Sequence, residues 1–178
     1  MNCLKKWRFI RMRLSRSVIN NLCVLSLIGS VVEQMDTRRD QYPPELCALH
    51  DELRTAHRYA RETVLELAGI DTSEEGLMLL PESDFRRWSR TERMFFDAVM
   101  KCVPEKTLDA RMWMTAVLLV TEDYAATVPE HATPYRGYWE TLSSILASIY
   151  ALYDPGLRCR KKMREGMDKG QKILEVLK

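Results

Sequence analysis

The amino-acid sequence predicts an all-α protein, a helical bundle of five to six helices with an additional N-terminal helix that is first basic and then apolar. Apolar residues recur at gaps of three or four along most of the chain, which is the spacing of one helix face. Prolines divide residues 43–178 into segments, and proline favours the first turn of a helix. No run alternates polar and apolar residues as a half-buried strand does. With 178 residues, 46% of them hydrophobic, the chain can bury a core of its own.

The N-terminal segment, residues 1–34, is predicted to form one continuous helix. Its apolar stripe continues to the methionine that follows and consists of Leu4, Trp7, Ile10, Leu14, Val18, Leu22, Leu25, Ile28, Val32 and Met35. The first sixteen residues contain no acid, and their basic side chains are Lys5, Lys6, Arg8, Arg11, Arg13 and Arg16. Residues 17–32 carry no charge. A helix of this kind can lie in the head-group layer of a membrane, with Trp7 at the apolar edge and the basic residues on anionic lipid.

Three interpretations of residues 17–32 compete: a membrane-inserted or interfacial helix, a cleaved signal sequence, and a helix packed against protein. Sixteen uncharged residues are fewer than the roughly 20 that span a bilayer, and Asn20 and Asn21 are among them. A cleavage site after Ser30 is poorly formed, because Ile28 stands where a small residue is expected. The preceding basic block favours attachment at the cytoplasmic side of a membrane, with a soluble cytoplasmic protein as the alternative.

The polar residues 35–44 predict a linker in front of a helical bundle domain at 45–178. Residues 1–34 would then be either a segment appended to the domain or the result of a translation start assigned too far upstream. Each helix of the bundle is expected to begin at a proline, a capping box or a turn. In order, the expected helices cover residues 44–68, 72–80, 81–102, 104–128, 138–152 and 157–178.

Three segments of the predicted bundle have distinctive features in the sequence. Residues 112–120 are apolar almost all round, which predicts the buried central helix of the bundle. In the last helix, Gly166 and Gly170 are expected to weaken the helix and leave its end loose. In the helix at 138–152 we expect Trp139 in the core. In the loop just before it, we leave Tyr135 and Arg136 open as an interface with a protein partner.

Charge is distributed unevenly behind the net +2. Residues 1–16 carry +6, residues 157–178 carry +5, and residues 33–156 carry −9. The C-terminal basic cluster consists of Arg158, Arg160, Lys161, Lys162 and Arg164. Basic ends favour an anionic partner, either lipid head groups or nucleic acid, or they pair with the acidic middle of the same chain.

Candidate sites for chemistry are few, and we expect no metal and no cofactor. His50 and His57 are seven residues apart on one predicted helix, about 10 Å along its axis, which is too far for a shared metal. His57 and Glu92 each interrupt an apolar stripe, and a buried pair could exchange protons. The favoured interpretation is structural: His57 is a hydrogen-bonded core residue, and Glu92 belongs to a capping box that begins at Ser89. The five cysteines are odd in number and widely spaced, which is typical of reduced thiols.

The sequence therefore predicts a small, non-enzymatic helical interaction or accessory protein, tethered to the cytoplasmic face of a membrane by its N-terminus. The alternative is a soluble helical regulator that binds nucleic acid through its basic ends. Both require a partner, and apolar seams on several helices also make a homo-oligomer an expectation.

Overall fold

The computed structural model describes residues 16–68, 90–103, 110–127, 133–153 and 160–178, and within these ranges it is all-helical, which confirms the predicted fold class. No strand occurs among the described residues. The helices are α1 (Arg16–Asp36), α2 (Pro44–Leu67), α4 (Arg90–Met100), α5 (Ala110–Thr127), α6 (Thr133–Tyr153) and α7 (Arg160–Leu177), with a short 3₁₀ helix η1 (Arg39–Gln41). The predicted short helix at 72–80 lies outside the described residues.

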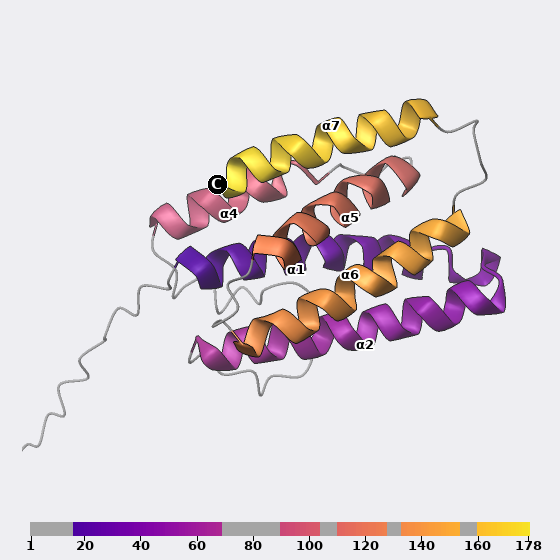
Figure 1. Cartoon of the computed structure of the whole chain (residues 1–178), viewed down its shortest axis with the longest axis horizontal. Coiled ribbons are helices and arrows are strands. Elements are labelled where there is room, and N and C mark those ends of the chain that lie inside the picture. Colours follow the sequence, from indigo (N-terminus) through magenta and orange to yellow (C-terminus); the bar gives the residue numbers. More distant parts are fainter. Residues whose placement is uncertain (1–15, 69–89, 104–109, 128–132, 154–159) are drawn as a thin grey trace, which may run out of the picture.

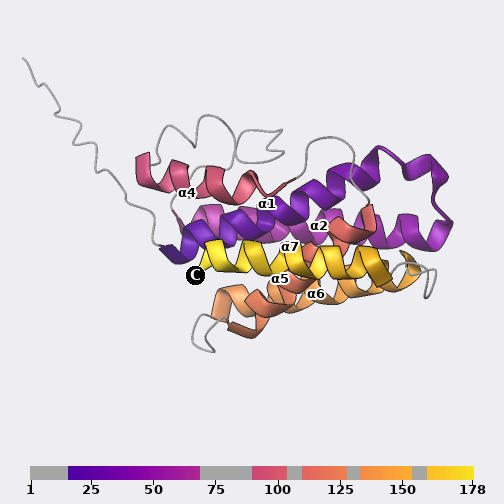
Figure 2. The same ribbon diagram turned by 90° about the horizontal axis from the view of Figure 1, so that it is seen from above.

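Helix α1 lies inside the bundle, between α5 and α7 on one side and α2 and α6 on the other (Figure 1). Turned by 90°, the molecule shows α4 on a further side of α1 (Figure 2). Every residue from Asn21 to Val32 is buried. By length and composition α1 could cross a membrane, yet 83% of its apolar window is buried within the protein. Its uncharged stretch thus forms the centre of the core.

The predicted boundary at residues 35–44 lies within a packed helical hairpin. Helix α1 continues to Asp36, η1 follows after a short turn, and Pro44 occupies the first turn of α2 as its fixed φ favours. Residues 16–34 therefore share one core with the bundle instead of forming an appended unit. The first half of the predicted basic helix, residues 1–15, lies outside the described residues.

Helix α6 begins at Thr133, five residues before the predicted start at 138. The predicted starts at 81, 104 and 157 lie outside the described residues, and apolar residues of these helices contribute to the core. Trp139 is fully buried, as the sequence predicts. The predicted central helix is α5, in which Trp113, Val117 and Val120 are fully buried. Its Leu118 and Leu119 remain partly exposed, so α5 is less enclosed than α1.

The two glycines of α7 pack against α5 and do not loosen the helix end. A Cβ on Gly166 would lie 2.4 Å from the Met112 carbonyl oxygen and 2.6 Å from the Thr115 Cβ. A Cβ on Gly170 would lie 2.9 Å from Leu119 Cδ2. Both glycines are buried, and α7 continues to Leu177. The prediction that these glycines leave the end of the helix loose is therefore wrong. Glycine lets two helix backbones approach closely, and this contact compensates for its low helix propensity.

We expect Gly166→Ala to lower the free energy of unfolding by about 1–3 kcal/mol, because the added methyl group overlaps a backbone carbonyl that cannot rotate away. Gly137→Ala in α6 is the matched control, since a Cβ there meets nothing within 4 Å. The Gly137→Ala substitution should raise the free energy of unfolding by roughly 0.5–1 kcal/mol. Urea unfolding of both variants measures the difference, and equal stabilisation of both would contradict the tight α5–α7 packing.

Candidate functional site

The polar side chains of α1 bind partners inside the bundle. Asn21 is the main example, with only 2% of its surface exposed. Its Oδ1 accepts hydrogen bonds from Tyr138 Oη (2.8 Å) and Trp139 Nε1 (2.9 Å). Its Nδ2 donates to Tyr124 Oη (3.0 Å) and to the Ser17 carbonyl (2.8 Å). Asn21 thus joins α1 to α5 and α6, and all its hydrogen-bonding capacity is used.

Further hydrogen bonds follow along α1. Ser30 Oγ accepts from Trp113 Nε1 on α5 at 2.8 Å and donates to the Leu27 carbonyl at 2.6 Å. From α2, the Nε2 atoms of His57 and His50 bond to the carbonyls of Leu25 (2.8 Å) and Val32 (3.2 Å). The two histidines and the two carbonyl residues are each seven apart, so the same contact repeats after two helical turns.

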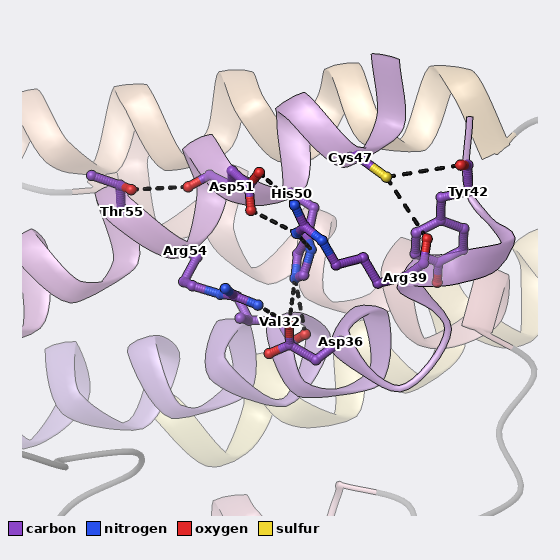
Figure 3. A network of polar contacts seen from close by, with 9 residues as sticks. All are labelled: Val32, Asp36, Arg39, Tyr42, Cys47, His50, Asp51, Arg54 and Thr55. Atoms are coloured by element: carbon purple, nitrogen blue, oxygen red, sulfur yellow. Dashed lines mark hydrogen bonds and ion pairs between the residues drawn. The ribbon is translucent and has the colours of Figure 1, made fainter. Parts of the chain in front are cut away.

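A polar network surrounds His50 where α1 turns into α2 (Figure 3). The ring is fully buried, and its Nδ1 faces Arg39 Nη1 at 3.1 Å. Arg39 in turn donates two hydrogen bonds of 2.6 Å to the Asp51 carboxylate. Asp36 forms an ion pair with Arg54, and its Oδ1 lies 3.6 Å from His50 Nε2.

The geometry of this network indicates a structural role, which is to hold α1 and α2 together. His50 Nε2 donates to a carbonyl and Nδ1 accepts from arginine, so the neutral ring has no nitrogen left for a substrate. The two acidic side chains each have a basic partner. The bonds from Arg39 also lower the pKa of the Asp51 carboxyl. Within the described residues, no group of three or more His, Cys, Asp or Glu side chains could hold a metal ion.

The predicted pair of His57 and Glu92 is not joined by a hydrogen bond. His57 uses its Nε2 on the α1 backbone, whereas Glu92 lies in the first turn of α4 and is 7% exposed. Ser89, the start of the predicted capping box, lies outside the described residues. The Cys23 side chain is fully buried. Burial raises the pKa of its thiol to about 12, so the thiol stays protonated.

Of the two basic clusters predicted from the sequence, the structure places only Arg16 and part of the C-terminal cluster. Of the N-terminal cluster, only Arg16 is described; it is exposed, with its guanidinium carbon 3.5 Å from the centre of the Phe95 ring. Lys5, Lys6, Trp7, Arg8, Arg11 and Arg13 lie outside the described residues. Near Arg16, the Asn20 amide donates to the Leu177 carbonyl at 3.3 Å, at the far end of α7 from the C-terminal cluster. Arg16 and the described residues of the C-terminal cluster therefore do not form one patch.

The C-terminal cluster lies on the first turns of α7. Arg160, Lys161 and Arg164 are exposed there, and Lys162 pairs with Glu165 at 3.2 Å. Arg158 lies outside the described residues. The same holds for the side chains of Tyr135 and Arg136, although both residues belong to α6.

An open groove of about 600 Å³ lies between α2 and α6. Ala56, Tyr138 and Ile145 contribute apolar surface, and Tyr59 exposes 65% of its own surface beside them. Asp51 and Glu52 lie at the groove as well, and Asp51 also belongs to the His50 network. An apolar floor with polar and acidic groups around it suits a peptide or helix better than a small enclosed substrate.

Comparison with protein-family models, with curated proteins and with solved structures finds no match to this chain. The described part of the chain is an all-α bundle in which α1 is buried.

The sequence did not predict that Asn21 and His50 are the residues on which the hydrogen-bond networks of the bundle converge. The available signal was the presence of amide, hydroxyl and imidazole groups on otherwise apolar helix faces. Such groups require internal partners when they are buried, but the sequence does not identify those partners.

We expect Asn21→Ala to lower the free energy of unfolding by about 3 kcal/mol or more, because Tyr138 and Trp139 lose the oxygen that accepts from them and Tyr124 loses the amide that donates to it. Asn20→Ala is the matched control one residue away. Asn20 makes a single long bond, its Oδ1 has no partner, and its loss should cost at most about 1 kcal/mol. Chemical unfolding of both variants compares them; equal losses would contradict the central role of Asn21.

The bundle should lose stability as the pH falls from about 6.5 towards 4. Burial is the main cause that lowers the pKa of both His50 and His57, in the latter to about 4, and neighbouring arginines add to it. The unfolded chain therefore takes up protons first, so the stabilisation is complete above pH 6.5 and is lost below it. His57 alone should account for roughly 2–3 kcal/mol between pH 7.5 and 4.5.

His57→Gln tests this pH dependence, because the glutamine amide can still donate to the Leu25 carbonyl but does not titrate. Urea unfolding at both pH values should show a smaller loss for this variant than for the wild type. An identical loss in the two proteins would show that His57 is not held neutral.

Proposed function

We propose that this chain is a non-enzymatic helical interaction protein that attaches peripherally to an anionic surface at the cytoplasmic face of a membrane. The attaching residues are Lys5, Lys6, Arg8, Arg11, Arg13 and Arg16. In this proposal α1 stays within the bundle, and residues 18–32 do not enter the lipid. Basic side chains near anionic lipid each contribute about 1 kcal/mol, so six of them suffice for reversible attachment.

The observation that supports peripheral attachment over insertion is the bonding of Asn21. Removing α1 from the bundle would leave Tyr138 and Trp139 without their common acceptor and would expose an apolar core to water. Asn21 and Ser30 would also enter hydrocarbon, where such groups are costly to bury. The charged segment in front of α1 can act without this loss.

The experiment is sedimentation of the purified full-length protein with vesicles. We expect binding to phosphatidylserine-containing vesicles, no binding to pure phosphatidylcholine vesicles, and release at about 0.5 M salt, where the screening length is only a few Å. Lys5→Glu, Lys6→Glu and Arg8→Glu together should abolish binding. Arg160→Glu, Lys161→Glu and Arg164→Glu together change the net charge equally and should leave binding in place.

Two outcomes would overturn the proposal. Protein that resists both high salt and alkaline washing would be inserted, and α1 would then be an anchor. Protein that does not bind anionic vesicles but is retained on heparin and released by salt would favour the alternative function, a regulator that binds nucleic acid.

A further inference from the structure

The helical glycines 137, 166 and 170 occupy two kinds of environment. Gly166 and Gly170 are explained by α5, which approaches both of them closely. Gly137 is helical too, but a Cβ built on it meets nothing within 4 Å. Its cost in helix propensity, about 1 kcal/mol, has no compensating contact within the described part of the chain. Gly137 lies in the groove between α2 and α6, where it leaves room for another backbone to come close.

The groove is shaped to receive one helix. Gly137, Thr141 and Ile145 follow each other at intervals of four on α6, so they form one straight row about 12 Å long. Ala56 and Tyr59 line the groove from α2. Small residues at one end and exposed aromatic surface beside them fit the apolar face of an amphipathic helix.

The charge on the groove favours a basic occupant. Helix α2 carries five acidic and three basic residues. Arg39 is already bonded to Asp51, and Arg54 is paired with Asp36. Glu52 is exposed at the groove and has no ion pair within the described ranges. An occupant with lysine or arginine beside its apolar face would complete this arrangement.

We propose that the groove between α2 and α6 binds residues 4–15 of the same chain. This segment has five basic residues and no acid, with Leu4, Trp7 and Ile10 at helical spacing on one face. At 1.5 Å per residue, twelve helical residues measure about 18 Å, enough to cover the row on α6 after a reversal of direction.

The start of α1 lies within reach of the groove. Tyr138 lines the groove, and its hydroxyl bonds to Asn21, which is only five residues from Arg16. Fifteen residues can extend to roughly 50 Å, so the chain before Arg16 reaches this end of the groove without strain. The groove and an anionic surface compete for the same basic side chains, and docking is measured without any lipid, so its failure leaves the proposed attachment untouched.

The test is hydrogen–deuterium exchange of the full-length protein at low salt, read on peptides that cover residues 4–15. We expect protection of several-fold or more over the unstructured rate in the wild type. Gly137→Leu fills the groove and Glu52→Lys reverses its charge, so each should remove that protection. Glu33→Lys is the matched control for the charge reversal, since Glu33 is exposed on α1, and it should keep the protection.

Circular dichroism and thermal unfolding show whether each variant remains folded, and Glu52→Lys changes only an exposed side chain. Absence of protection in the wild type would overturn the proposal, as would protection that survives both Gly137→Leu and Glu52→Lys. Protection that grows with protein concentration, together with a dimer in sedimentation, would assign the segment to a second copy and would also overturn it.

Discussion

The enclosure of α1 is the constraint on which the rest of the structure depends. A helix whose residues from Asn21 to Val32 are all buried must be surrounded by apolar side chains on every face. It must also find partners for Asn21 and Ser30, because a buried polar group without a hydrogen bond costs about 1–3 kcal/mol. Helices α2, α4, α5 and α6 together meet both requirements, and none of them could do so alone.

Hydrogen bonds to α1 define how the bundle is aligned. Burial of apolar surface is non-directional and would tolerate helices that slide by one turn. The bonds from Tyr138 and Trp139 to Asn21, and from Trp113 to Ser30, are lost by such a shift. The two histidines of α2 add a repeat of seven residues along the α1 backbone. Directional contacts therefore select one register among several apolar ones.

The two long seams of the bundle differ in how completely they are closed. Along the α5–α7 seam, Gly166 and Gly170 let the backbones meet, and no space remains for a side chain. Along the α2–α6 seam, Gly137 and Thr141 leave an open groove with exposed Tyr59 beside it. The first arrangement stabilises the fold, and the second provides a surface where another helix can be accommodated. The open seam thus lies where the core does not fill the space between two helices.

The sequence by itself determined the all-α class, the start of α2 at Pro44 and the burial of Trp139, because helical periodicity and proline positions are local properties of the chain. It did not determine where residues 17–32 lie, because an apolar helix has the same composition whether lipid or protein covers it. Nor did it show that Gly166 packs while Gly137 faces a groove, since the two residues differ only in what stands opposite them. The roles of Asn21, His50 and His57 came from partners between 18 and 118 residues away in the chain. Only the tertiary structure decided these points, because it alone brings such partners within hydrogen-bonding distance.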